Sequence, residues 1–183
     1  MGELVTSLLA LLCAPMSAGG ETLDVLIRGG EVYDGNGGPA IRADVGVAGG
    51  RIVALGALEG RAAKRVIDAA GLIVAPGFID LHNHSDRTFF DGDNKGARNY
   101  LAQGCTTVVT GNCGGGRLDV AAYLAQLEAG GVGVNVAHLV PHGTLRASVI
   151  GKEDRAPTKE ELAALEERLE GGLGAGAFGM STG

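Results

Sequence analysis

Two histidines separated by one residue, His82 and His84, follow an apolar stretch and could bind a metal ion together. Residues 72–79 are predicted to form a buried strand that a Pro-Gly pair bends. Because alternate residues of a strand share a face, both imidazoles should be directed at one point. Asp80 and Asp86 occupy the same alternating positions and are expected on that face as well. Converging imidazoles are typical of zinc sites, although an isolated pair is more often an ordinary surface or core feature.

A cysteine, Cys113, follows the next predicted strand, within the sequence Gly-Asn-Cys-Gly. A thiolate is a strong zinc ligand, and this position lies at the same end of the expected sheet as His84. A buried cysteine beside a glycine-rich turn is the alternative interpretation. Cys105 precedes the strand and is expected to pack in the core. Eight extended residues span about 26 Å, so the two thiols are too far apart for a disulfide.

Two further residues are candidates for contact with a substrate. His138 ends the third predicted strand, and His142 follows it. His142 could either line a pocket or hydrogen-bond to the backbone. Ser181 ends the fourth predicted strand at the same edge. It has no visible base partner, so a nucleophilic role is not predicted.

The elements that must position these residues change in character along the chain. Up to Ala75, short strands with a two-residue Gly49-Gly50 turn indicate a small antiparallel sheet. After Gly77, strands alternate with helices, two of which begin at the capping residues Asp119 and Thr158. This alternation predicts an α/β fold with a parallel sheet, equal to half of a (β/α)8 barrel. The strands are expected at 72–79, 106–110, 132–140 and 177–181, and the helices at 93–103, 119–130 and 158–171.

The composition excludes some classes of partner. The chain has 183 residues, 45% of them hydrophobic, which is enough for a real core. Its net charge of −6 and the absence of a Lys/Arg cluster argue against nucleic acid as a partner.

The first twenty residues are expected to be a signal peptide. Residues 4–13 are apolar but too few to cross a bilayer, and small residues follow at 17–20. The segment has no Lys or Arg, so a start at Met16 is the alternative. The protein is therefore expected in the cytoplasm, or in the periplasm or outside the cell if the signal peptide is real. Passage through a membrane is expected only by way of this segment.

With these motifs in place, the chain resembles the amidohydrolase superfamily, and within it the N-acyl-D-amino-acid deacylases, or D-aminoacylases. The blocks PGFIDLHNHSD, TTVVTGNCG and GAFGMSTG carry the resemblance. It implies a small β-sandwich segment at residues 21–75, after the signal peptide at 1–20, and the first half of a (β/α)8 TIM-type barrel at 76–183. It also implies that His82, His84 and Cys113 are metal ligands, with Cys113 in place of the carboxylated lysine of hydantoinase-type relatives.

The resemblance further implies zinc-dependent hydrolysis of the amide bond of a small-molecule N-acyl-D-amino acid. The family's two other zinc histidines and its catalytic aspartate are expected beyond Gly183, so no catalytic residue is assigned within this chain. The sequence is accordingly expected to be an N-terminal fragment that is inactive alone and needs its C-terminal half. Two alternatives stay open: a cyclic-amide hydrolase of the hydantoinase or dihydroorotase type, and a non-catalytic metal-binding subunit.

Overall fold

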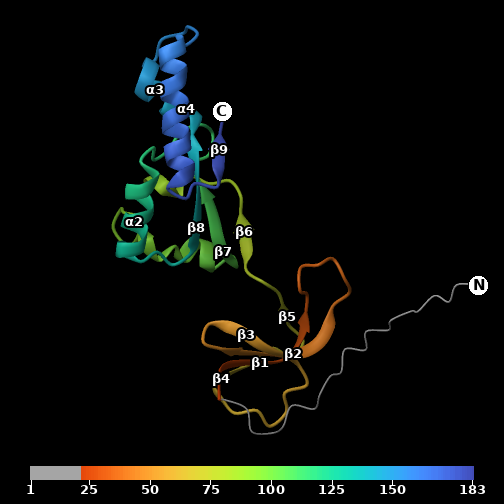
Figure 1. Ribbon diagram of the computed structural model, residues 1–183. Coiled ribbons are helices and arrows are strands. Elements are labelled where there is room, and N and C mark those ends of the chain that lie inside the picture. The colour runs from red at the N-terminus through yellow and green to blue at the C-terminus, as the bar shows by residue number, and fades with distance from the viewer. Residues whose placement is uncertain (1–21) are drawn as a thin grey trace, which may run out of the picture. The chain divides into compact units, whose positions relative to one another are not determined.

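The computed structural model describes residues 22–183 and divides the chain into two compact units, one ending at Pro76 and one beginning at Gly77 (Figure 1). The expected signal peptide at residues 1–20 lies outside the described residues. No helix in the described part of the chain is long and apolar enough to cross a membrane.

The first unit is a five-stranded mixed sheet in which β1 pairs with three other strands. The order is β3-β2-β1-β4, and β5 also pairs with β1. The strands β2 and β3 are antiparallel to their neighbours, whereas β4 and β5 run parallel to β1. The predicted small antiparallel sheet is therefore confirmed for β1, β2 and β3 and wrong for β4 and β5. After β3 the chain returns to the start of β1, where Ala62 accepts a hydrogen bond from Leu23, and only then begins β4. The bounds are β1 Leu23–Val32, β2 Ile41–Ala48, β3 Arg51–Gly56, β4 Ala63–Asp68 and β5 Ile73–Val74.

The hairpin predicted at Gly49-Gly50 is confirmed. It joins β2 to β3, and both glycines have positive φ angles, 57° and 72°. Two successive left-handed residues match the right-handed twist of the strands, and glycine adopts that conformation without steric cost.

The second unit is built on a four-stranded parallel sheet of order β6-β7-β8-β9. Helices connect the strands, as in the predicted α/β fold and the first half of a (β/α)8 barrel. Its elements are β6 Phe78–Asp80, the 3-10 turns η1 Ser85–Arg87 and η2 Asn94–Gly96, α1 Arg98–Leu101, β7 Cys105–Thr110, α2 Val120–Gly130, β8 Asn135–Pro141, α3 His142–Ile150, α4 Lys159–Gly174 and β9 Gly179–Ser181.

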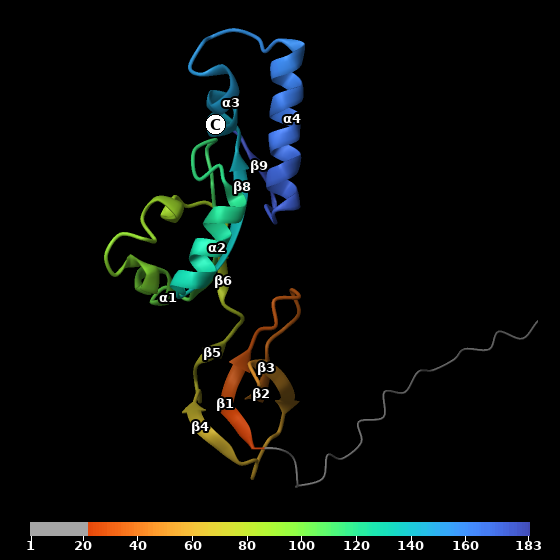
Figure 2. The same cartoon turned by 60° about the vertical axis from the view of Figure 1, so that its left-hand side comes forward.

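The core of the second unit forms where helices pack on one face of β7 and β8. In one cluster, Tyr123 and Leu127 of α2 surround Val108 of β7. In the other, residues of α2, α3 and α4 surround Val140 of β8, and Figure 2 shows these three helices gathered around that strand. Because the four strands are parallel, all four carboxyl ends lie at the same edge of the sheet.

Both predicted helix caps are confirmed. The carboxylate of Asp119 accepts a hydrogen bond from the Ala122 amide at the start of α2. At the start of α4, Thr158 and Glu161 form the reciprocal capping box that the sequence indicates.

Three other expectations about elements need correction. The apolar run at 72–79 is two short strands, β5 and β6, which belong to different units and whose residues are mostly exposed. The predicted helix at 93–103 is reduced to η2 and the single turn α1. The helix α3 was missed, because it begins directly after β8 with Pro141 at its N-cap and has no polar capping side chain.

Candidate metal centre

The side chains of His82, His84 and Cys113 converge at the carboxyl ends of β6 and β7. Their ligand atoms all lie within 4.8 Å of one another, and His82 Nε2 is 3.1 Å from Cys113 Sγ. The two imidazole rings are 5.7 Å apart and nearly perpendicular. Within residues 22–183, no other group of three His, Cys, Asp or Glu side chains has this proximity.

The two histidines follow the end of a strand, as the sequence predicted, but the extended alternation expected to direct them does not reach them. The strand β6 ends at Asp80, and both histidines belong to the loop that follows. In that loop Asp80 accepts a hydrogen bond from the His82 amide at 3.1 Å, which holds the first histidine against the strand end. The imidazoles therefore converge through a loop conformation rather than through strand alternation.

Asp86 occupies the same alternating sequence position as the histidines, but its carboxylate does not lie with their imidazoles. It is fully buried in η1, and neither carboxylate oxygen has a hydrogen-bond partner among the described residues. Gly116 packs directly against this carboxylate, because a Cβ at that position would be 2.9 Å from Asp86 Oδ2. The chemistry at this edge of the sheet therefore rests on two imidazoles and one thiol.

The turn that presents Cys113 requires left-handed backbone. Gly111, Cys113 and Gly114 have φ angles of 79°, 54° and 65°. At Gly111 a side chain is also excluded by space, because a Cβ would be 2.2 Å from the carbonyl oxygen of Leu139. Cys113 is one of only two non-glycine residues with positive φ in the described chain. The turn directs its thiol toward the histidines at a cost in backbone energy.

Two buried asparagines, which the sequence analysis missed, connect the histidine loop to the cysteine turn. The side-chain amides of Asn83 and Asn112 both donate to the carbonyl of Val109, at 3.2 and 2.7 Å. The Asn112 amide also donates to the carbonyl of Asn83 at 3.3 Å. Each asparagine is adjacent in sequence to a candidate ligand, which was the available signal. Their hydrogen bonds hold the two ligand-bearing segments together.

The remaining predicted residues have different surroundings. Ser181 is buried at the end of β9, and its hydroxyl hydrogen-bonds to the backbone of the cysteine turn. His142 is half-buried as the first residue of α3. Cys105 is a partly buried free thiol, and Cys113 is free as well. Contact of His142 or Ser181 with a substrate stays a prediction.

His138 is a core residue rather than part of the centre. Its Nε2–H donates to the Arg117 carbonyl at 2.8 Å, and its Nδ1 accepts from the Thr110 hydroxyl at 2.8 Å. The ring also lies 4.6 Å from that of Tyr123. Burial lowers the pKa of His138 below its usual value of 6.5, and the hydrogen bond to Arg117 and the charge of Asp86 oppose that shift. Burial likewise raises the pKa of Tyr123 to about 12.

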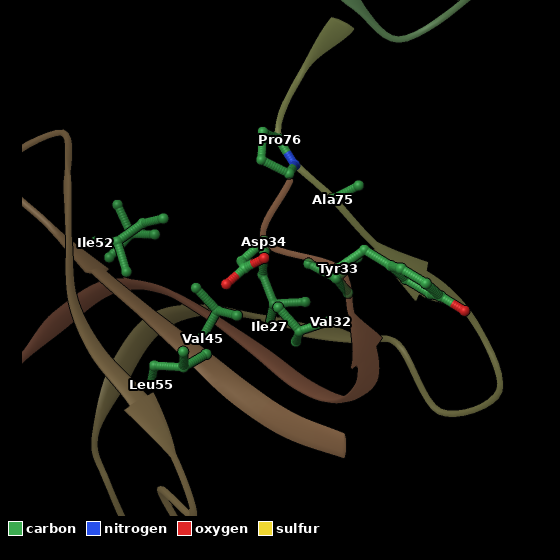
Figure 3. A pocket seen from close by; sticks show the side chains of 11 residues that line it. Ile27, Val32, Tyr33, Asp34, Val45, Ile52, Leu55, Ala75 and Pro76 are labelled. Atoms are coloured by element: carbon green, nitrogen blue, oxygen red, sulfur yellow. The ribbon is translucent and has the colours of Figure 1, made fainter. Parts of the chain in front are cut away.

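A hollow in the first unit lacks the groups needed for chemistry. It is a hollow of about 270 Å³ against β1, β2 and β3, which Figure 3 shows from close by. Aliphatic side chains such as Ile27, Val45 and Leu55 line it, and Asp34 and Tyr33 supply its only polar side chains. Sites for small molecules usually combine an apolar wall with several convergent polar groups. The histidine–cysteine centre is therefore the better candidate for a functional site.

The donor set of this centre fits a zinc ion. Imidazole nitrogen and thiolate sulfur are the preferred zinc ligands, and three protein ligands with an open position are typical of catalytic sites. All three side chains are exposed, so a small molecule can approach them.

Comparison with known proteins agrees with this geometry. The profile of the Amidohydrolase family matches residues 65–183. A D-aminoacylase of Alcaligenes xylosoxydans xylosoxydans is 40% identical over 186 residues, which cover 89% of this chain and 38% of the relative. An N-acyl-D-glutamate deacylase of the same organism is 42% identical over 185 residues, with the same two coverages.

A solved structure is also similar to this chain in fold and in sequence. The N-acyl-D-glutamate deacylase of Bordetella bronchiseptica, complexed with zinc and a phosphonate inhibitor that mimics the tetrahedral intermediate, superimposes with a TM-score of 0.83. It is 42% identical in sequence, and the match covers 89% of this chain and 39% of that structure. The chain thus spans well under half the length of the relatives that it matches.

Proposed function

Because this chain belongs to the amidohydrolase family, we propose that it supports the zinc-dependent hydrolysis of the amide bond of N-acyl-D-amino acids. The observation that carries the proposal is the convergence of His82, His84 and Cys113, whose ligand atoms lie within 4.8 Å of one another. The substrate class is proposed because the relatives at 40–42% identity are a D-aminoacylase and an N-acyl-D-glutamate deacylase. The chain spans 38% of the length of these relatives, so the activity is proposed for the whole protein to which these residues belong.

The proposed role of each residue follows from its chemistry. His82 and His84 supply neutral nitrogen donors, and Cys113 supplies a thiolate whose negative charge strengthens the binding of a divalent cation. When bound, zinc supplies a Lewis acid that polarises the acyl carbonyl and favours water as a nucleophile at neutral pH. None of the three ligands is then available as a proton acceptor. A proton acceptor beyond Gly183 stays a prediction.

The orientation of the ligands depends on the residues around them. Asp80 holds the His82 backbone, and Asn83 and Asn112 hold the histidine loop against the cysteine turn. Loss of residues that orient metal ligands typically lowers metal affinity or activity about 10–100-fold. The centre is thus expected to be formed before the metal binds.

The first test measures bound zinc in the purified 183-residue chain. Replacement His82→Ala or Cys113→Ala should abolish most of the zinc binding, because two remaining ligands hold zinc poorly. Cys105→Ala is the matched control, since Cys105 is a free thiol at the opposite end of β7. Zinc binding that is unchanged in both ligand variants would refute the proposed centre.

The second test addresses the substrate. The complete reading frame that encodes these residues should release D-amino acids from N-acetyl-D-amino acids, and chelation should abolish the activity. N-acetyl-L-amino acids and hydantoins are the comparison substrates. Preferential cleavage of hydantoins would instead identify a cyclic-amide hydrolase, and zinc binding without any hydrolysis would favour a non-catalytic subunit.

A further inference from the structure

We infer that Ser181 is a positioning residue, which holds the cysteine turn in the conformation that presents Cys113 to a metal. The inference rests on the proposed function, because it concerns the same zinc centre. Ser181 ends β9, whereas the turn follows β7, so the contact joins two segments about seventy residues apart in the sequence.

The hydroxyl of Ser181 is bonded to both ends of the turn. It donates a hydrogen bond to the carbonyl of Gly111 and accepts one from the amide of Gly114, at 3.1 Å. These two residues flank Asn112 and Cys113. Among the described residues, no other side chain outside the turn hydrogen-bonds to its backbone. One hydroxyl thus connects the two ends of the segment that carries the thiol.

The turn needs such a connection because its conformation is unfavourable. Cys113 has φ of 54°, and a left-handed conformation costs a non-glycine residue about 1–2 kcal/mol. Just after the turn, the Gly115 amide donates to the Asn112 carbonyl at 3.2 Å, and from α3 the Thr144 amide donates to the Gly114 carbonyl at 2.9 Å. Backbone contacts alone leave the Gly111 carbonyl and the Gly114 amide without partners, and Ser181 satisfies both groups.

The burial of Ser181 supports a positioning role over contact with a substrate. Its exposed fraction is 9%, whereas Cys113 is exposed. Its donor and one acceptor position are already occupied by the backbone of the turn. A substrate would have to displace these hydrogen bonds to reach the hydroxyl.

The test compares Ser181→Ala with Ser148→Ala in the 183-residue chain. Ser148 lies in the same unit and also hydrogen-bonds to a backbone carbonyl, that of Leu145, but its side chain makes no hydrogen bond to the cysteine turn. Loss of a residue that orients a metal ligand typically lowers metal affinity about 10–100-fold. Zinc affinity should therefore fall by at least about tenfold in Ser181→Ala. It should stay at the wild-type value in Ser148→Ala and close to it in Ser181→Thr, which retains the hydroxyl.

A second readout does not depend on metal. In the metal-free chain, amide exchange at Gly114 should become about fivefold faster in Ser181→Ala, because that amide loses a hydrogen bond worth about 1 kcal/mol. In the wild-type chain the same amide should be protected. Exchange at the unprotected rate in the wild-type chain would overturn the inference even if Ser181→Ala did not fold.

The outcomes separate this inference from the proposed function. A folded Ser181→Ala chain with wild-type zinc affinity and wild-type exchange at Gly114 would overturn the inference and leave the centre intact. An equal loss of zinc affinity in Ser148→Ala would also overturn it, since it would show general destabilisation. If the wild-type chain bound no zinc while Gly114 exchange still responded to Ser181→Ala, the proposed function would fail, and Ser181 would retain its role in shaping the turn.

Discussion

The thiol of Cys113 is presented by a residue whose backbone would favour glycine. Its neighbours Gly111 and Gly114 adopt positive φ at no cost, but Cys113 must have a side chain to contribute a ligand. Backbone strain of this kind persists where surrounding contacts determine the conformation, and it is concentrated at functional sites. Asn112 and Ser181 provide those contacts here.

At the same scale, His138 makes the stability of the fold depend on pH. Burial lowers its pKa in the folded chain below the usual value of 6.5, so the unfolded chain binds the proton more readily. The stability that depends on a neutral His138 is complete above about pH 7 and falls as the pH decreases through 6.5.

The measurement is the midpoint of thermal unfolding between about pH 7 and pH 5. The wild-type chain should lose stability over this interval, and His138→Gln should lose less of it because the titrating group is gone. An equal slope in the wild type and His138→Gln would show that other groups cause the pH effect.

At the scale of elements, the helix α4 illustrates how local chemistry fixes a helix start. Thr158 and Glu161 each hydrogen-bond to the other's backbone amide, at 3.2 and 2.8 Å. Glu161 also pairs with Arg155, whose guanidinium lowers the pKa of that carboxyl to about 2. The carboxyl of the cap therefore stays charged at neutral and mildly acidic pH.

Removal of the cap should destabilise the second unit modestly. Thr158→Ala should lower the free energy of unfolding by about 1 kcal/mol, because the Glu161 amide loses its side-chain acceptor. Chemical denaturation followed by helical circular dichroism measures the change. Thr158→Ser keeps the acceptor and should remain near the wild type; equal stability of the alanine variant would mean that packing alone defines the start of α4.

At the scale of the whole molecule, the parallel sheet exposes much apolar surface. Phe78 and Ile79 of β6 are 62% and 59% exposed, and Phe178 beside β9 is 79% exposed. Within residues 22–183, no strand pairs with the outer edge of β6. Open strand edges with apolar side chains promote pairing with other chains.

The 183-residue chain is therefore expected to self-associate when it is purified alone. Sedimentation velocity over a wide range of concentrations should show species larger than a monomer. Ile79→Lys places a charge on the exposed edge strand and should shift the distribution toward the monomer. A wild-type chain that stays monomeric and melts cooperatively would contradict this expectation.

The sequence by itself determined what depends on nearby residues. The Gly49-Gly50 hairpin and the caps at Asp119 and Thr158 follow from turn and capping chemistry within a few positions of the chain. The alternation of strands and helices predicted the parallel sheet. It also placed His82, His84 and Cys113 at one edge of that sheet, because parallel strands present their carboxyl ends together.

The tertiary structure decided what depends on distant residues. It divides the apolar run at 72–79 between two units, and it buries Asp86 and His138 while leaving the three candidate ligands exposed. It also brings Ser181 to the cysteine turn across some seventy residues of sequence. No local pattern encodes these outcomes, because each arises from packing between segments that meet only when the sheet has formed.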